Sequence, residues 1–432
     1  MPLKHTVEEL VLKNGARGLL INVPDTTAVG YGIAFRAGNS YVKSPDLSQV
    51  AHIMEHMAFG PNEKFPSLEE FSQDFTKNGA TRNAHTGSIA IEYAVNAALM
   101  EWDRILDLQL LAVAKPIFTQ QNLTSEKKNV REEITGYGNN HGRVLMQTIW
   151  KKAGINRWFD PDELKTIDTV TLQDIREHYG RTHTSENLRF IFAGDLAAHK
   201  DTIVEKLSTI ELPKGERLEL PLDVARHVGP VHVHRQDMQS LAFNIRFFLN
   251  RELTRRELRA MNVLCYVLTD TLHSRIFGKA RIRGLCYSMG SGYSTEPTQL
   301  SEFGFGGQVS EENASELIKL ITSELVEVAK NGITQEELLA AKANKLGSMQ
   351  MATQTVGSLI SWYATDYYDN ERIDSVDLMP ALIDGTTDEE IRGLVREFIN
   401  SGMWAFGEIG NISEDTTNAH SELLSKALEK KW

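Results

Sequence analysis

The chain has little cysteine and no long hydrophobic stretch. Only two of its 432 residues are cysteines, Cys265 and Cys286, so a framework of disulfides is excluded, and two lone thiols are typical of a reducing compartment. No run of about 18 apolar residues is present, which excludes a membrane-spanning helix. Residues 1–13 have no apolar run and are not rich in arginine, so they resemble neither a secretory signal nor a transit peptide. These absences predict a cytoplasmic protein.

An excess of positive charge is also lacking. The net charge is −12, so the surface should repel nucleic acid and anionic membranes, although most of this charge can serve solvation alone. Hydrophobic residues make up 41% and charged residues 24%, which is the balance of a folded protein with a buried core. A length of 432 residues exceeds one ordinary core and predicts more than one domain.

Two weaker sequence patterns do not indicate a binding site. The glycines of 304–307 lack a following Gly-Lys-Ser/Thr and the G-x-G-x-x-G spacing, so nucleotide binding is rejected. His232 and His234 alternate as in a strand and have no evident third ligand, so a plain strand is favoured over a metal pair.

A degenerate internal repeat divides the sequence. Thr171-Leu-Gln-Asp-Ile-Arg is followed by a strand at 188–193 and then Gly194. It has a counterpart 216 residues later in Thr387-Asp-Glu-Glu-Ile-Arg, which is followed by a short strand at 403–406 and then Gly410. Residues 212–230 are rich in proline and glycine and have no helical period, which predicts an extended linker. We therefore expect a half at 1–211, a linker at 212–230, and a similar half at 231–432.

Strand and helix patterns alternate within each half. They predict an α+β fold of two similar α/β-sandwich halves, each a mainly antiparallel sheet with helices packed chiefly on one face. The strands expected in the first half are 18–23, 30–36, 89–95 and 188–193. The helices expected there are 45–59, 68–78, 98–113, 122–137 and 172–179.

Helix-start signals support these boundaries. Ser44 before Pro45 predicts the start of the helix at 45–59. Ser67 with Glu70 forms a capping-box pattern, and Gly79 is a candidate C-cap. Capping boxes are also expected where Thr254 and Thr334 each precede a glutamate by three residues.

The helix at 45–59 carries His52-Ile-Met-Glu55-His56. Residues four apart share a helix face, so two imidazoles in this spacing can bind one zinc ion. Glu55 borders the same face and can act as a general base toward water. Five residues of pattern are weak alone, and a chance pair of histidines remains the alternative.

A catalytic zinc needs a third protein ligand, and the helix at 122–137 offers carboxylates for it. Glu126 and Glu133 are two turns apart and share a face, whereas Glu132 points elsewhere. One of the pair can ligate the metal while the other orients a histidine. The alternative is that Glu126 pairs with a neighbouring basic residue on a solvated helix.

Taken together, these residues resemble the pitrilysin-type (inverzincin, M16) zinc metallopeptidase family, which has an H-x-x-E-H motif followed by E-x6-E. The short two-domain form, as in mitochondrial processing peptidase subunits, is the nearest in layout. The resemblance implies that His52, His56 and Glu133 are ligands of one Zn2+ per chain. It also implies that Glu55 is the catalytic base and that Glu126 supports a ligand from behind.

Two further segments match this family. Residues 79–86 resemble its Gly-Gly-x-x-Asn-Ala-x-Thr stretch, with an alanine in place of the second glycine, which implies that Asn83 and Ala84 bind substrate along a strand edge. Residues 281–287 resemble its Arg-x-x-Gly-Leu-x-Tyr segment. There the resemblance implies that Arg281 and Tyr287 bind the substrate backbone and stabilise the oxyanion.

The implied function is a zinc metalloendopeptidase that hydrolyses unfolded peptides or short polypeptides in a closed chamber. Because the zinc motif and the Arg/Tyr segment occur in one chain, a homodimer is expected, and a heterodimer with a related chain is the other arrangement of the family. A non-catalytic or partner-dependent subunit is the competing prediction. Peptides are the expected ligands, and neither nucleic acid nor a membrane is an expected partner.

Overall fold

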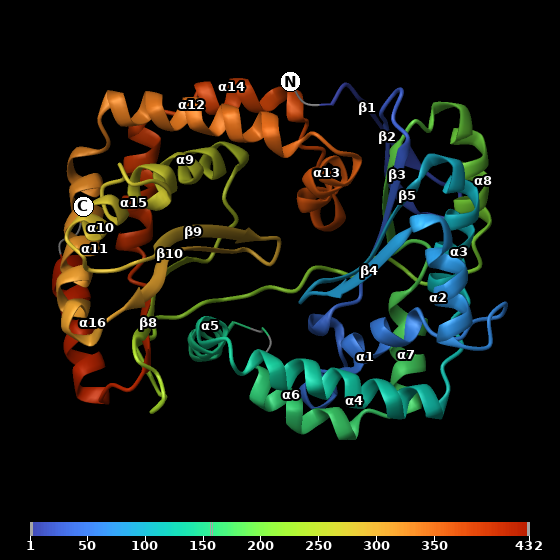
Figure 1. Cartoon of the computed structure of the whole chain (residues 1–432), viewed down its shortest axis with the longest axis horizontal. Coiled ribbons are helices and arrows are strands. Elements are labelled where there is room, and N and C mark those ends of the chain that lie inside the picture. Colours follow the sequence, from blue (N-terminus) through green and yellow to red (C-terminus); the bar gives the residue numbers. More distant parts are fainter. Residues whose placement is uncertain (1–2, 156, 158, 430–432) are drawn as a thin grey trace. The chain divides into compact units, whose positions relative to one another are not determined.

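The computed structural model describes residues 3–155, 157 and 159–429, and the chain divides into two compact units, drawn in Figure 1. Unit 1 is made of Met1–Thr135, Asp160–Leu220 and Met349–Val376. Unit 2 is made of Gly136–Phe159, Pro221–Ser348 and Asp377–Trp432. Each unit therefore combines segments from both sides of the linker. The halves at 1–211 and 231–432 describe the internal repeat, and that division stays a prediction.

Unit 1 contains a six-stranded sheet in the order β1-β2-β6-β3-β5-β4. Only β2 and β6 pair in parallel, and the other neighbours are antiparallel. β4 forms an edge, because β5 is its one partner among the described strands. The strands are β1 (Thr6–Val11), β2 (Arg17–Asn22), β3 (Ala28–Arg36), β4 (Thr81–Thr86), β5 (Ala90–Ala98) and β6 (Leu188–Gly194).

Most helices of unit 1 lie on one face of this sheet. Ile33 and Phe35 of β3 share a core with Ile53 of α1 and Phe71 of α2, all of them fully buried. Alternation along β3 and a helical period in α1 bring these side chains to the same layer. The helices around this core are α1 (Val50–Ala58), α2 (Leu68–Thr76), α3 (Trp102–Ala114), α4 (Gln120–Tyr137), α6 (Asp160–Thr166), α7 (Leu172–Thr182) and α8 (Lys200–Thr209).

Unit 2 contains a five-stranded sheet in the order β7-β11-β8-β10-β9, in which only β7 and β11 are parallel. Its larger core joins Phe303 of β10 and Phe247 of β8 to Phe398 of α15. The strands are β7 (Gly229–His234), β8 (Leu241–Leu249), β9 (Met289–Glu296), β10 (Leu300–Val309) and β11 (Trp404–Gly410). The helices are α9 (Arg255–Cys265), α10 (Phe277–Ile282), α11 (Glu311–Asn331), α12 (Gln335–Ala352), α14 (Met379–Asp384), α15 (Asp388–Asn400) and α16 (Glu414–Leu428).

One helix covers the second face of each sheet, and it comes from the other half of the sequence. In unit 1 this helix is α13 (Val356–Asn370), whose Leu359 and Tyr363 are buried together with Ile191 of β6. In unit 2 it is α5 (His141–Ala153), whose Leu145 and Ile149 are buried with Ala405 of β11. The two helices begin 215 residues apart, close to the spacing of the repeat. The predicted fold class is confirmed, with mainly antiparallel sheets and helices chiefly on one face.

The helix expected at 45–59 is interrupted, so that prediction was wrong in part. Pro45–Leu47 forms a 3-10 turn without a side-chain cap from Ser44, and α1 begins at Val50. Ser67 does cap α2 by accepting a hydrogen bond from the Glu70 N–H at 3.2 Å. That helix ends at Thr76, because Lys77, its C-cap, turns to an extended ψ of 142°. The prediction of Gly79 as the C-cap was therefore wrong, since Gly79, with a φ of 83°, lies beyond the cap.

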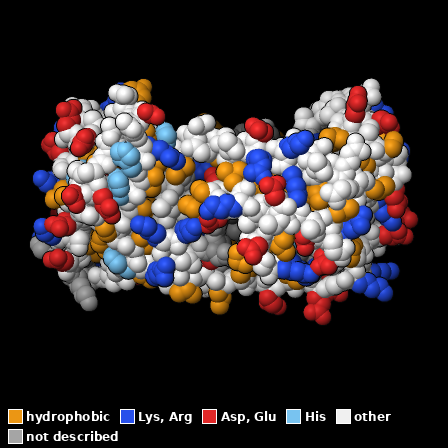
Figure 2. Space-filling model, turned by 90° about the horizontal axis from the view of Figure 1, so that it is seen from below, with side chains coloured by type: hydrophobic (Ala, Val, Ile, Leu, Met, Phe, Trp, Pro, Cys, Tyr) orange, Lys and Arg blue, Asp and Glu red, His pale blue; other side chains and the backbone are white. Residues whose placement is uncertain are grey.

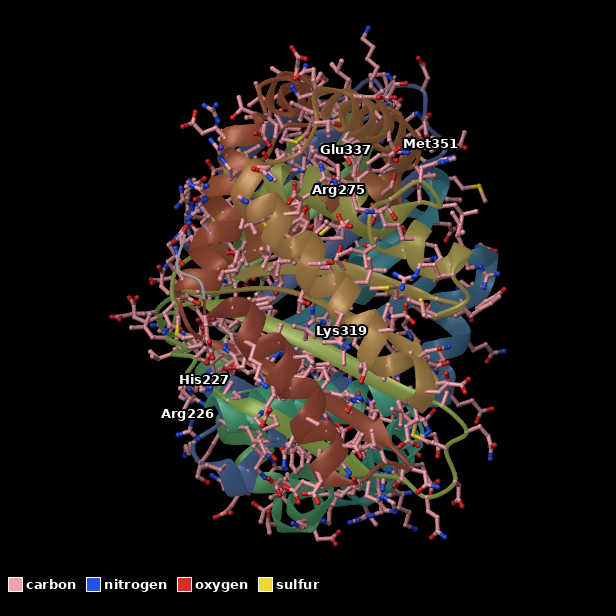
Figure 3. The ribbon with its side chains drawn as sticks, turned by 90° about the vertical axis from the view of Figure 1, so that its left-hand side faces the viewer. Arg226, His227, Arg275, Lys319, Glu337 and Met351 are labelled. Atoms are coloured by element: carbon pink, nitrogen blue, oxygen red, sulfur yellow. The ribbon has the colours of Figure 1, made fainter. Side chains whose placement is uncertain are left out.

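Both capping boxes expected in the second half are present. In each, the threonine hydroxyl accepts from a backbone N–H while the glutamate three residues later accepts from the threonine N–H. Glu337, in the box of Thr334, also accepts two hydrogen bonds from Arg275, at 2.6 and 2.5 Å (Figure 3). This carboxylate therefore joins the start of α12 to the segment before α10.

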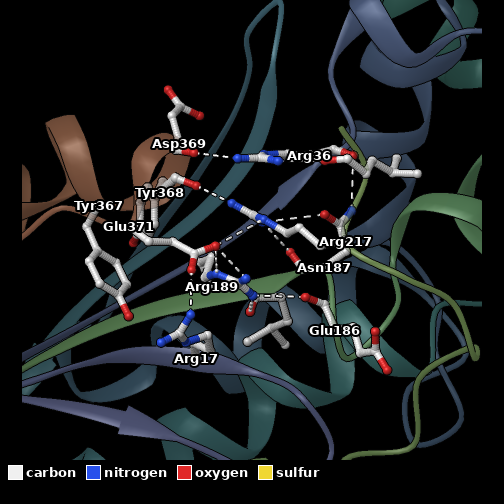
Figure 4. A network of polar contacts seen from close by, with 12 residues as sticks. Arg17, Arg36, Glu186, Asn187, Arg189, Arg217, Tyr367, Tyr368, Asp369 and Glu371 are labelled. Carbon is white, nitrogen blue, oxygen red and sulfur yellow. Dashed lines mark hydrogen bonds and ion pairs between the residues drawn. The ribbon is translucent and has the colours of Figure 1, made fainter. Parts of the chain in front are cut away.

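A partly buried ionic network holds the end of α13 in unit 1 (Figure 4). Glu371, which ends the helix with a left-handed φ of 55°, pairs with Arg189 at 2.6 Å and Arg17 at 2.8 Å. Arg217 lies 3.5 Å from the same carboxylate and donates to the Tyr368 carbonyl at 2.6 Å. Burial, together with the charge of neighbouring arginines, lowers the pKa of Arg217 to about 9. The Glu371 carboxylate is thus the shared anionic partner of three guanidinium groups.

No helix among residues 3–155 and 159–429 is both long and apolar enough to cross a bilayer. On the face drawn in Figure 2, Lys and Arg side chains are interspersed with Asp and Glu side chains.

Candidate metal centre

The centre is built on α1, which is buried along almost its whole length. Ile53, Met54 and Met57 pack into the core of unit 1 and anchor the helix from behind. His52, with 6% of its surface exposed, is buried, and His56 is half-buried. Their spacing of four residues places the two imidazole rings with centroids 4.8 Å apart.

A carboxylate from α4 reaches both imidazoles. One oxygen of Glu133, Oε2, lies 3.5 Å from Nε2 of His52 and 3.5 Å from Nε2 of His56. Ligands about 2.0–2.2 Å from a tetrahedral zinc are separated by roughly 3.3–3.5 Å. The distances from the Glu133 oxygen to each of the two imidazole nitrogens therefore match the separation of two ligands on one zinc ion.

Glu55 is a second carboxylate close to the histidines. One ligand atom each of His52, Glu55 and His56 lie within 4.8 Å of one another. Glu55 is 7% exposed, and its Oε2 accepts a hydrogen bond from the Thr86 hydroxyl at 3.0 Å. Geometry thus offers Glu55 and Glu133 as alternative ligands. Glu133 fits better, because a single oxygen is equally distant from both imidazole nitrogens.

The ring nitrogens that face away from the centre have partners of their own. His52 Nδ1 lies 3.2 Å from Gln49 Oε1, and His56 Nδ1 lies 3.1 Å from Glu126 Oε2. The Asn129 amide donates to the same Glu126 oxygen at 3.0 Å. Acceptors at Nδ1 favour a proton there and leave the Nε2 lone pairs free for a metal.

Sequence reasoning missed Gln49 and Thr86. Gln49 precedes His52 by three residues, and this helical spacing was the available signal. Thr86 lies inside the segment 79–86 but was assigned no contact with Glu55.

Burial and the nearby charges shift the titration of this cluster. Burial raises the pKa of Glu55, against the opposing effect of the two histidines. Burial lowers the pKa of His56, but hydrogen bonds to Glu126 and Glu133 outweigh this and raise it to about 10. The His56 hydrogen bond in turn lowers the pKa of Glu126. Because a metal ligand must be deprotonated, zinc binding here should release a proton.

The α4 helix positions its carboxylates as its periodicity predicts. Leu123 and Val130 are buried, and Glu126 and Glu133 border the same stripe. Glu132 is exposed, on another side of the helix.

The remaining predicted residues belong to other elements of the fold. Asn83 and Ala84 are on β4, the sheet edge, where Asn83 is exposed and Ala84 half-buried. Arg281 and Tyr287 belong to unit 2 and are exposed, with the guanidinium carbon 4.2 Å from the centroid of the tyrosine ring. This pair is therefore a cation–π contact on the surface of its unit.

Replacing Glu126 with glutamine should weaken zinc binding about 10- to 100-fold, because His56 loses the carboxylate that orients it. Competition with a chromophoric chelator at fixed pH measures the Kd for zinc. Glu132→Gln is the matched control, since it changes the same charge on the exposed side of α4 and should leave Kd unchanged. Equal Kd values for the wild type and Glu126→Gln would contradict the role of Glu126.

Comparison with known proteins gives the family. Residues 17–158 match the family model described as Insulinase (Peptidase family M16), and residues 169–345 match that of the Peptidase M16 inactive domain. An "uncharacterized zinc protease" of Rickettsia bellii is 22% identical over 82% of this chain and 85% of its own length. Another, from Streptomyces coelicolor, is 24% identical over 91% and 87%.

The fold has close counterparts among solved structures. A peptidase M16 inactive domain from Pseudomonas fluorescens superposes with a TM-score of 0.83 at 18% identity, over 94% of this chain and 99% of that one. The two family models follow one another along the chain and together cover most of it. The protein therefore belongs to the M16 peptidase family, in its short two-domain form.

Proposed function

We propose that this protein is a zinc metalloendopeptidase that hydrolyses unfolded peptides or short polypeptides. The observation that carries the proposal is the position of Glu133 Oε2, 3.5 Å from both imidazole nitrogens, beside the buried carboxylate of Glu55. The printed names of the relatives, which call them zinc proteases, support the same activity.

His52, His56 and Glu133 would hold one zinc ion per chain. When bound, zinc supplies a Lewis acid that lowers the pKa of water and polarises the scissile carbonyl. Glu126 and Gln49 fix the ring orientation of the two histidines from behind. The second half of the sequence contains no further H-x-x-E-H motif, which supports a single site in each chain.

Glu55 acts as the general base and then as the general acid. Its carboxylate accepts a proton from the attacking water and delivers that proton to the leaving nitrogen as the C–N bond breaks. The Thr86 hydroxyl holds one carboxylate oxygen in place during this transfer. Burial raises the pKa of Glu55 above its ordinary value, which makes its carboxylate a stronger base toward the attacking water.

The free edge of β4 would bind the substrate as an added strand. Backbone groups of Asn83 and Ala84 would pair with the peptide, and this pairing requires an extended, unfolded substrate. We infer that Arg281 and Tyr287 donate to the substrate backbone and to the developing oxyanion. A homodimer in a closed chamber, with a heterodimer as the alternative, remains part of this proposal.

A partner-dependent or non-catalytic subunit is the second candidate. The label "inactive domain" on the match to residues 169–345 favours it for that part of the chain. The complete set of His52, Glu55, His56 and Glu133 in unit 1 favours catalysis by the whole chain.

Metal removal tests the proposal. The purified chain should cleave a quenched fluorescent peptide library, lose this activity with a chelator, and regain it when zinc is added. Tight binding of one zinc per chain without cleavage would support the partner-dependent subunit. Absence of both zinc binding and cleavage would leave a non-catalytic protein.

A further inference from the structure

Arg82 of β4 is a half-buried cation surrounded by aromatic rings. Its guanidinium carbon lies 4.7 Å from the centroid of Phe59, 5.0 Å from that of Phe71 and 5.5 Å from that of Phe75. These rings are themselves buried, with 8% or less of their surface exposed. The aromatic faces stabilise the charge, but they cannot accept hydrogen bonds as a carboxylate does.

The polar partners of Arg82 are incomplete. Nη2 donates to the Ser72 hydroxyl at 2.6 Å, whereas Nη1 is buried and has no hydrogen-bond partner among the described residues. No ion pair within 4.0 Å joins Arg82 to any carboxylate of the described chain. Arg104, on the neighbouring α3, shows the usual arrangement, because it pairs with Glu101 at 2.5 Å and with Asp74 at 3.6 Å.

A desolvated charge without a counter-ion is costly. Burial alone lowers the pKa of Arg82, with no carboxylate opposing the effect. Buried charges in proteins are ordinarily paired, and an unmade hydrogen bond on such a group costs free energy. A ligand that brings a carboxylate would remove this cost.

The position of Arg82 connects it to the metal centre. Side chains alternate along a strand, so Arg82, Ala84 and Thr86 project from the same face of β4. Thr86 contacts Glu55 directly, and Phe59, which stacks on Arg82, follows His56 by three residues. Four residues along a strand span about 13 Å. The guanidinium is therefore a few residues away from the reacting centre, measured along the sheet edge.

We propose that Arg82 forms a subsite for an acidic side chain of the peptide substrate. A peptide added to the β4 edge presents every second side chain on the face that carries Arg82. The aspartate or glutamate opposite Arg82 lies two to four residues from the scissile bond, on one side of it. Its carboxylate supplies the missing counter-ion to the guanidinium group. This inference rests on the proposed peptidase activity.

A paired peptide series tests the subsite. Glutamate and glutamine are placed in turn at each position within five residues of the scissile bond, and kcat/KM is measured for each pair. A charge-assisted hydrogen bond predicts a preference for glutamate of about tenfold or more at one position in the expected range. Arg82→Gln should bring that ratio close to 1. Lys77→Gln, which removes an exposed cation paired with Asp74, should keep it.

Binding provides a readout that does not depend on turnover. The Glu55→Gln chain should bind the preferred glutamate peptide about tenfold more tightly than its glutamine partner, and adding Arg82→Leu should abolish the difference. Leucine suits the surrounding phenylalanines, so thermal unfolding should show a folded double variant.

Two results would overturn the subsite. The first is an equal kcat/KM for the glutamate and glutamine peptides at every position. The second is a preference for glutamate that persists in both the Arg82→Gln and the Arg82→Leu variants. Failure of the proposed peptidase would look different, because no peptide of either series would then be cleaved in a chelator-sensitive way.

Discussion

Glu55→Gln is expected to lower kcat for peptide hydrolysis by about 10³-fold, within the range that general acid–base groups contribute. Glutamine preserves the size of the side chain but cannot take a proton from water. The Thr86 hydroxyl can still donate to its amide oxygen, so the local structure should persist. Discontinuous peptide-cleavage assays measure kcat, and elemental analysis of the same sample measures its zinc content.

The zinc content of this variant separates the two carboxylates near the histidines. If Glu133 is the ligand, Glu55→Gln retains one zinc per chain, whereas Glu133→Gln loses it. Loss of zinc from Glu55→Gln with retention in Glu133→Gln would reverse the two roles. Glu132→Gln again controls for the loss of a charge on α4.

Glu371→Gln is expected to reduce the free energy of unfolding by about 3 kcal/mol, at the lower end for a broken buried ion pair because the side chain is 23% exposed. The substitution leaves Arg17, Arg189 and Arg217 without their shared carboxylate. Urea unfolding at pH 7 measures the change. Glu177→Gln, which breaks an exposed pair with Lys43, should change the free energy of unfolding much less than Glu371→Gln does.

The stability contributed by Glu371 should depend on pH. Burial raises the pKa of this carboxyl, but Arg189 and the neighbouring arginines lower it below its ordinary value of 4.5. A depressed carboxyl pKa contributes stability that is complete above the unfolded value and is lost as pH falls through the folded value. The difference between wild type and variant should therefore shrink below about pH 4.5. A difference that is constant from pH 7 to pH 3 would show that the network is not held by charge.

The sequence allowed the fold class to be predicted because its signals are local. A short, mainly apolar run before Gly194 identified the strand at 188–193, and capping boxes identified the helix starts after Thr254 and Thr334. The exchange of α5 and α13 could not be predicted, because it depends on packing between segments far apart in the chain. The sequence also did not predict the break in the helix before α1, since Ser44 and Pro45 are equally compatible with a 3-10 turn.

The candidate site was likewise predictable only in part. Helical spacing alone grouped His52 with His56 and Glu126 with Glu133, and the structure places these residues together. Spacing could not decide which carboxylate of α4 approaches the imidazole nitrogens, because that depends on how two helices pack. Arg82 gave no signal for the same reason. An arginine in a strand is ordinarily exposed, and only the fold surrounds this one with phenylalanine rings.

The most direct test of the metal assignment is anomalous diffraction at the zinc edge from crystals of the chain grown with zinc. The assignment predicts one anomalous peak in unit 1, bonded to Nε2 of His52, Nε2 of His56 and a carboxylate oxygen of Glu133, with Glu55 beside it and unbonded. A peak ligated by Glu55 in place of Glu133, or no peak between the two histidines, would contradict it.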